Sequence, residues 1–222
     1  LTVGINLISD PLARNALLKT QGYLDSVFLE TLENQLVETA TPIYRERKLL
    51  CERLLPLFQQ YYALIAQNEE KPDLQYRSQL SSGDYHELLL AARATDRSLG
   101  HTSIGVHRDG IDFFLDGYPL RREGSQGQQK TFVVALRLAQ YSYIAEILRE
   151  KPILLLDDIF DKLDSQRVER IVGLVSGDSY GQIFITDTNR EHLDRILQSG
   201  TTDYKLFYVE NGEITEKGGD NV

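Results

Sequence analysis

The feature of this sequence that most constrains its fold is a short apolar run that stops at two adjacent carboxylates, Ile153-Leu154-Leu155-Leu156-Asp157-Asp158. A run of this length is typical of a buried strand in an open α/β sheet, which delivers ligand-binding groups at its carboxyl end. We predict that one of the two acids holds Mg²⁺ and that the other orients or deprotonates an attacking water. Because burying two neighbouring carboxylates is costly, we also expect a cation or a basic partner beside them.

The last third of the chain alternates between strand-like and helix-like patterns. This alternation predicts a parallel sheet whose apolar strands are buried on both faces. The strands are expected at 153–156, 182–186 and 204–209, and the helices at 165–175 and 190–198.

The first part of the chain is mostly helical in pattern. We expect two or three helices over 22–67, divided or kinked at Pro42 and Pro56, packed as a hairpin or arm. A strand over 74–80, a helix from the cap Asp84 to about Arg97, and a small antiparallel element over 103–120 follow. The predicted buried stripe of the long helical region is Leu29, Leu32, Leu36, Ile43, Leu50, Leu54, Leu57, Tyr61 and Leu64. The sequence thus divides into a mostly helical lobe, 1–123, and an α/β part, 124–222.

A second motif, Gly124-Ser125-Gln126-Gly127-Gln128-Gln129-Lys130, opens a predicted helix that runs to about Arg149. It is not a phosphate-binding P-loop, because Gln129 stands where that pattern requires glycine before the lysine. What remains is a helix N-terminus with a serine cap and a permissive Gly127. Its unpaired N–H groups and dipole favour an anion such as a phosphate.

Composition excludes several classes of protein. Hydrophobic residues make up 41% and charged residues 26%, no apolar run reaches the roughly 18 residues that span a bilayer, and the single cysteine fits a reducing compartment. We therefore expect a cytoplasmic protein without a membrane partner. The net charge of −9 argues against a surface that binds nucleic acid everywhere, although local basic groups remain candidates.

In this order, the motifs resemble those of the RecF family of bacterial DNA-repair ATPases, in the SMC-like branch of the ABC ATPases. The resemblance is carried by 125–130, 153–158 and 161–164, by Gly105-Val106-His107-Arg108-Asp109, where the family has proline in place of Val106, and by Arg14-Asn15-Ala16-Leu17-Leu18-Lys19. It implies an α/β fold: the C-terminal part of an ABC/SMC-type P-loop ATPase, a parallel sheet with flanking helices, beside a mostly helical lobe.

The resemblance also implies a role for each matching residue. Asp157 is similar to the Walker B aspartate that organises Mg²⁺, Asp158 to the catalytic acid, and Asp164 to the D-loop aspartate that reaches across a dimer. The signature motif, which contacts the γ-phosphate of ATP held by the opposite subunit, is matched by Ser125, Gln126, Gly127 and Gln128. Thr186 and Asp187 stand where transporters of this class often carry a histidine, and we assign them no role.

The family carries its P-loop near the N-terminus, and this sequence has none. We therefore expect it to be the C-terminal part of a longer ATPase, inactive alone. The implied function is ATP-dependent dimerisation that clamps gapped or single-strand/double-strand junction DNA and helps to load a recombinase with recombination mediator proteins. The candidate DNA contacts are Arg45, Lys48, Arg121 and Arg122.

Three alternatives remain open at this point. The helical section could make the chain a non-catalytic dimerisation or partner-docking module. A metal nuclease could use Asp157, Asp158 and Asp161, and a transporter ATPase is a further possibility. We interpret His107 as a structural residue that bonds within a tight turn, and we predict no zinc site because the histidines lack ligand spacing.

Overall fold

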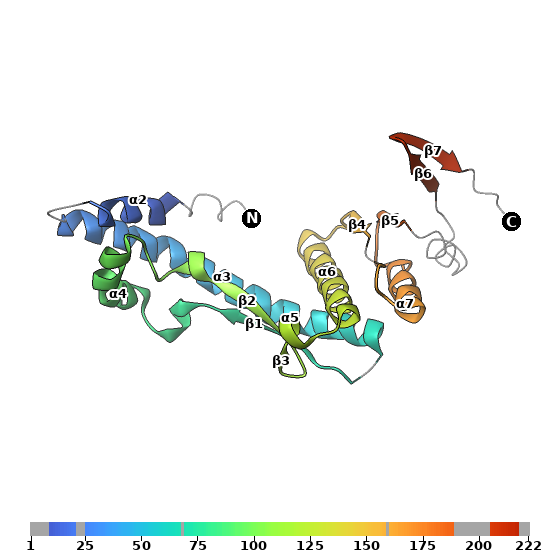
Figure 1. The fold of residues 1–222 in the computed structure, drawn as a ribbon, viewed down its shortest axis with the longest axis horizontal. Coiled ribbons are helices and arrows are strands. Elements are labelled where there is room, and N and C mark those ends of the chain that lie inside the picture. The colour runs from blue at the N-terminus through green and yellow to red at the C-terminus, as the bar shows by residue number, and fades with distance from the viewer. Residues whose placement is uncertain (1–8, 21–24, 68, 159, 189–204, 218–222) are drawn as a thin grey trace. The chain divides into compact units, whose positions relative to one another are not determined.

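A computed structural model describes residues 9–20, 25–67, 69–158, 160–188 and 205–217 (Figure 1). The chain divides into two compact units. The first contains residues 1–59 and 70–124, and the second contains residues 60–69 and 125–222.

The first unit is built on helices α2 (Ser9–Leu18) and α4 (Tyr85–Leu99) and on most of α3 (Ser26–Ala66), whose residues from 60 on belong to the second unit. The prediction of two or three helices over 22–67 is wrong, because α3 is one helix of 41 residues that contains both Pro42 and Pro56. A proline inside a helix removes one backbone hydrogen bond but need not end it when the neighbouring turns hold. Beside Pro42, the Thr41 hydroxyl donates to the Val37 carbonyl at 2.8 Å.

The buried stripe of α3 follows the prediction in part. Leu29, Leu32, Leu36 and Leu54 are buried, whereas Leu50 and Leu64 are 39% and 43% exposed. The side chains that replace them in the core are Ala40, Cys51, Phe58, Tyr62 and Ile65. An α-helix drifts relative to a seven-residue repeat, so a stripe extended over eleven turns from its first half rotates away from the core.

The rest of the first unit is a small antiparallel sheet with short helical turns. The strands are β1 (Pro72–Arg77), β2 (Gly110–Leu115) and β3 (Tyr118–Pro119), in the order β1-β2-β3. The turns are the 3-10 helices η1 (Gln79–Ser82) and η2 (Val106–Arg108), and the four-residue helix α5 (Leu120–Glu123) follows β3. This confirms the small antiparallel element, and Asp84 caps α4 as predicted, its carboxylate accepting from the Glu87 amide at 3.1 Å.

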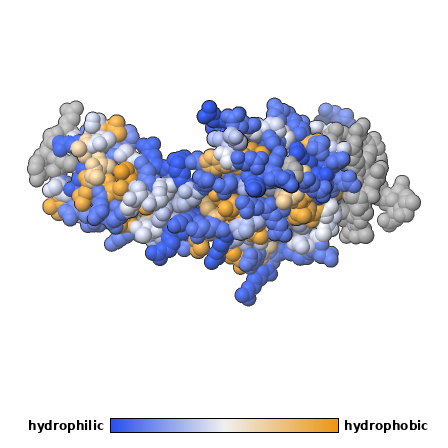
Figure 2. All heavy atoms as spheres, turned by 90° about the horizontal axis from the view of Figure 1, so that it is seen from below, coloured by the Kyte–Doolittle hydropathy of each residue, from blue (hydrophilic) through white to orange (hydrophobic). Residues whose placement is uncertain are grey.

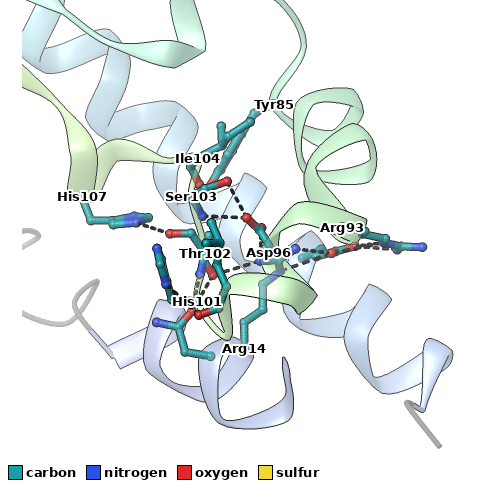
Figure 3. A network of polar contacts seen from close by, with 12 residues as sticks. Arg14, Tyr85, Arg93, Asp96, His101, Thr102, Ser103, Ile104 and His107 are labelled. Carbon is teal, nitrogen blue, oxygen red and sulfur yellow. Dashed lines mark hydrogen bonds and ion pairs between the residues drawn. The ribbon is translucent and has the colours of Figure 1, made fainter. Parts of the chain in front are cut away.

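A buried polar network ties the helices of the first unit together (Figure 3). The Arg14 guanidinium, fully buried, forms ion pairs with Glu33 of α3 at 3.0 Å and with Asp96 of α4 at 2.7 Å. It also donates to the Thr102 hydroxyl at 3.0 Å, and Arg93 forms a further ion pair with Glu33. Since every charge in this network has an opposite partner, burial of the network is compatible with a stable fold.

The second unit contains helices α6 (Gln126–Leu148) and α7 (Ser165–Val175) and strands β4 (Leu154–Asp157) and β5 (Ile183–Thr186). The two strands are parallel, with Leu154 paired to Ile183 and Asp157 paired to Thr186, and α7 lies between them in sequence. A βαβ unit of this kind confirms the predicted parallel pairing. The predicted helix 190–198 lies outside the described residues.

The end of the second unit differs from the prediction of one strand over 204–209. Strands β6 (Leu206–Glu210) and β7 (Glu213–Lys217) form a separate antiparallel hairpin. Its turn residues Asn211 and Gly212 both have positive φ, 52° and 84°. An Asn-Gly pair is the favoured sequence for such a two-residue turn, so the hairpin could have been predicted from this dipeptide.

The predicted burial of the parallel strands on both faces is wrong for the residues described. Along β4, Leu154 and Leu156 are buried while Leu155 is 70% exposed, and Phe184 of β5 is 49% exposed. On the face of the molecule drawn in Figure 2, hydrophobic residues form separate patches among hydrophilic ones.

No helix among the described residues combines the length and the apolar character that crossing a membrane requires.

Candidate functional site

The two acids lie where the sequence predicts, at the exit of a parallel strand. Asp157 is the last residue of β4, and Asp158 follows it with a positive φ of 46°. The Thr186 hydroxyl donates to Oδ1 of Asp157, and the Asp158 amide donates to the Thr186 carbonyl at 3.2 Å. Both carboxylates are exposed, so their charges are not buried in the described structure, and the cation expected beside them stays a prediction.

Thr186 is the residue that sequence reasoning missed at this strand exit. It ends β5 and pairs in register with Asp157. Two parallel strands that end at the same level bring their last side chains to the same sheet edge, so the predicted ends of the two strands contained the signal. The hydroxyl orients one Asp157 oxygen and leaves the other available to a metal-bound water.

The Ser125 motif forms the N-terminus of α6 and is closed by a capping box. Ser125 Oγ accepts from the Gln128 amide at 3.2 Å, and the Gln128 side-chain oxygen accepts from the Ser125 amide at 2.8 Å. No acceptor for the Ser125 hydroxyl proton, or for the Gln126 and Gly127 amides, is found in the part of the chain that the structure describes. These groups are the donors that an anion at this helix end would meet.

One hydrogen bond and a close approach at Gly127 bring this helix end to the segment that follows β4. Lys130 Nζ of α6 donates to the Asp158 carbonyl at 2.8 Å. A Cβ added to Gly127 would lie 3.1 Å from Arg167 Nη1 and 3.6 Å from the Lys162 carbonyl oxygen, so glycine permits the close approach. Within the second unit, the signature-like turn and the acid pair are therefore parts of one surface.

Asp164, the D-loop candidate, caps α7. Its Oδ1 accepts from the Arg167 amide at 2.9 Å, and its Oδ2 lies 3.5 Å from Arg167 Nε. This places the Arg167 guanidinium, only 19% exposed, beside Gly127 at the start of α6. Arg167 adds positive charge where an anion would bind, and sequence reasoning did not select it because nothing in its local pattern distinguishes it from a surface arginine.

The chemistry of this surface suits a phosphorylated ligand better than a metal held by protein alone. Within the described ranges, no three His, Cys, Asp or Glu side chains gather into a metal-binding group. The nuclease alternative needs such a cluster from Asp157, Asp158 and Asp161, and these residues do not supply it. A Mg²⁺ bound at Asp157 would take its remaining ligands from water and from phosphate oxygens, as this ion commonly does.

The remaining candidate residues belong to the first unit. Arg45 and Lys48 lie exposed on α3, and Arg121 and Arg122 lie exposed on α5. His107 stands in η2 with Nε2 3.2 Å from the Thr102 carbonyl oxygen, a contact within the tight turn that agrees with a structural role. Partial burial lowers the pKa of His107 below its usual value of 6.5.

Curated sequences named DNA replication and repair protein RecF are similar to this chain. The one from Parabacteroides distasonis is 49% identical over 203 residues, which are 91% of this chain and 55% of that protein. The one from Bacteroides thetaiotaomicron is 44% identical over 205 residues, 92% of this chain and 56% of that protein. The chain thus spans little more than half the length of these curated relatives, and no family model matches it.

Solved structures with a similar fold carry the same name. A structure of the recombination mediator protein RecF-ATP in the RecFOR pathway matches 98% of this chain and 58% of its own, with a TM-score of 0.77 and 24% identity. A structure of RecF-ATPrS in the same pathway gives a TM-score of 0.76 at 23% identity. At this identity the likeness concerns the fold, and it confirms the predicted fold class.

Proposed function

Because this chain belongs to the RecF family, of whose curated members it matches about 55% of the length, we propose that its protein is an ATP-dependent DNA-binding protein of recombinational repair. In this proposal ATP lies between two copies. The Ser125 turn of one copy binds the γ-phosphate, while Asp157 of the other positions Mg²⁺ and Asp158 acts as the catalytic acid.

One observation carries the proposal. The Ser125 hydroxyl proton and the first amides of α6 have no acceptor among the described residues, while Asp157 and Asp158 stand exposed at the exit of β4. A triphosphate with its magnesium ion would satisfy both sets, since it offers oxygens to the first and a cation to the second. The name of the RecF-ATP structure supports the choice of ATP.

We also propose the wider setting implied by the family. The dimer formed by ATP would hold gapped or junction DNA in the cytoplasm, through Arg45, Lys48, Arg121 and Arg122, and would help to load a recombinase together with recombination mediator proteins. The exposure of all four cations in the first unit supports this assignment. Such contacts to phosphates would make DNA binding fall steeply with salt concentration.

A mixing experiment on the full-length protein tests whether the site is shared between copies. Ser125→Arg blocks the γ-phosphate side of a site, and Asp158→Asn removes the catalytic acid, so each variant alone should lose ATP hydrolysis. In a mixed dimer both substitutions fall in one of the two sites and the other site is intact. With random pairing, the mixture should recover about a quarter of the wild-type rate, as twofold symmetry dictates.

Matched controls use the same substitutions elsewhere in the second unit. Ser179→Arg and Asp178→Asn change exposed residues of the loop before β5 and should leave hydrolysis at the wild-type rate. If the two site variants fold and dimerise yet their mixture stays inactive, the shared site is refuted.

A further inference from the structure

A polar cavity in the first unit has no role in the function proposed above. It has a volume of about 600 Å³ and is lined by Arg77, Ser78, Gln79, Ser103 and Arg108. Each lining residue carries a polar or charged group beside the aliphatic part of its side chain, whereas pockets for small organic ligands are lined mainly by apolar and aromatic residues. The cavity therefore suits a charged or strongly hydrated ligand.

The charges around the cavity favour an anion. Arg108 in η2 is exposed and has no carboxylate partner in the part of the chain that the structure describes. Arg77, at the end of β1, is 62% exposed and pairs through Nε with Asp112 at 2.9 Å. That contact uses one edge of the guanidinium, and its terminal nitrogens remain to donate.

Arg77 lies against the backbone of the neighbouring strand and pairs with Asp112 of that strand. Its partner in the sheet is Gly110, and a Cβ at that glycine would lie 2.7 Å from Arg77 Nη2. The guanidinium therefore lies close against the Gly110 backbone, a position that any larger residue would obstruct. A pre-positioned guanidinium loses less freedom when it binds a phosphate, which raises its contribution to affinity.

The hydroxyl groups of the cavity are already engaged. Ser103 Oγ donates to Asp96 of the buried network, labelled in Figure 3, and Ser78 Oγ accepts from the Leu80 amide at 3.2 Å and is hydrogen-bonded to the Tyr76 side chain. The available donors are thus the two guanidinium groups and the Gln79 amide. This set matches the oxygens of a phosphate, and no aromatic ring lines the cavity to stack on a base.

We propose that Arg77 and Arg108 form a phosphate site for the backbone of DNA, additional to the four cations named above. The inference rests on the proposed DNA-binding function. The proposed contact binds the phosphate backbone and does not discriminate between bases, because the cavity supplies cationic donors and no stacking surface.

The test is the salt dependence of DNA binding by the full-length protein with ATP, measured by fluorescence anisotropy on a labelled gapped duplex. Arg108→Gln removes a cation without breaking any ion pair seen among the described residues. It should weaken binding roughly tenfold near 0.1 M salt and reduce the slope of log K against log salt by about 1. Arg108→Lys keeps the charge and should keep most of that slope.

Arg53→Gln is the matched control, since Arg53 is an exposed arginine of α3 that does not line the cavity. It should change binding much less than Arg108→Gln. Equal effects of Arg108→Gln and Arg53→Gln would overturn the cavity site while leaving the proposed function intact. Absence of salt-dependent DNA binding by the wild-type protein would overturn both. Binding of inorganic phosphate that Arg108→Gln abolishes, with DNA binding unchanged, would identify a small anion as the ligand and reject the proposal.

Discussion

Replacement of Arg14 by methionine should destabilise the first unit more than any single surface change. The Arg14 side chain is fully buried and pairs with two carboxylates, Glu33 and Asp96, whose side chains are also fully buried (Figure 3). Methionine keeps most of the volume but supplies no charge and no donor. The change therefore tests the ion pairs and not the packing.

The magnitude follows from what each carboxylate retains. Glu33 keeps its ion pair with Arg93, so it still has an opposite charge beside it. Among the residues that the structure describes, Asp96 keeps the amide and the hydroxyl of Ser103, which are neutral donors. Because one buried charge is left without a counter-charge, we expect Arg14→Met to cost about 3–5 kcal/mol of unfolding free energy.

Two further variants distinguish the loss of the counter-charge of Asp96 from a general destabilisation of the core. Arg93→Met removes a cation that is 33% exposed and leaves Glu33 paired with Arg14, so it should cost only about 1 kcal/mol. Adding Asp96→Asn to the Arg14→Met protein neutralises the lone carboxylate and should recover about 1–3 kcal/mol. In the wild-type background the same Asp96→Asn change should be destabilising, since it breaks a satisfied pair.

The assay is native-state hydrogen exchange of the full-length protein, followed on peptides from α2 and α4, because it reports the opening free energy of this unit alone. A loss of protection by Arg14→Met in these peptides, partly restored by Asp96→Asn, is the expected pattern. If Arg14→Met leaves protection within about 1 kcal/mol of wild type, or if Asp96→Asn lowers it equally in both backgrounds, the charge argument fails.

The remaining predictions concern the helix end and the tight turn. Gly127→Ala should leave stability within about 0.5 kcal/mol of wild type, since only the mobile end of Arg167 must move. The added methyl group should nevertheless hinder the approach of a phosphate to the residue 127 amide and so weaken ATP-dependent dimerisation, measured by sedimentation. The lowered pKa of His107 means that the unfolded chain takes up the proton first, so stability should fall as pH decreases from about 6.5 towards the folded-state pKa. His107→Gln should flatten this part of the urea-midpoint curve, and an unchanged curve would contradict the assignment.

Signals that lie within a few residues were read correctly from the sequence. The serine cap of α6 and the aspartate cap of α4 are local, because each side chain bonds to an amide three residues later. The strand exit at Asp157 is also local, since the apolar run and the acids that end it are adjacent in sequence. Such features depend on neighbours whose identity the sequence states directly.

Features that depend on distant partners were not readable in the same way. The burial of Arg14 requires Asp96, which lies far along the chain, and the helical pattern around Arg14 gives no sign of it. The exposed face of β4 is a second case. The apolar run predicts a strand that can be buried on both faces, but it does not say which segment would cover each face. The unbroken α3 adds a third case, in which tertiary packing outweighs the helix-breaking tendency of two prolines.

The two halves of the proposed ATP site are each oriented before any ligand binds, and this bears on how a dimer would form. Ser125 is fixed by its capping box with Gln128, and Asp157 is fixed by the Thr186 hydroxyl. Among the described residues Ser125 and Asp157 form no hydrogen bond to each other, so a nucleotide would not have to break such a bond to bind both. Most of its binding free energy would then remain to hold two copies together. On this reasoning, substitution of Thr186 should weaken ATP-dependent association by loosening Asp157 even though Thr186 touches no nucleotide.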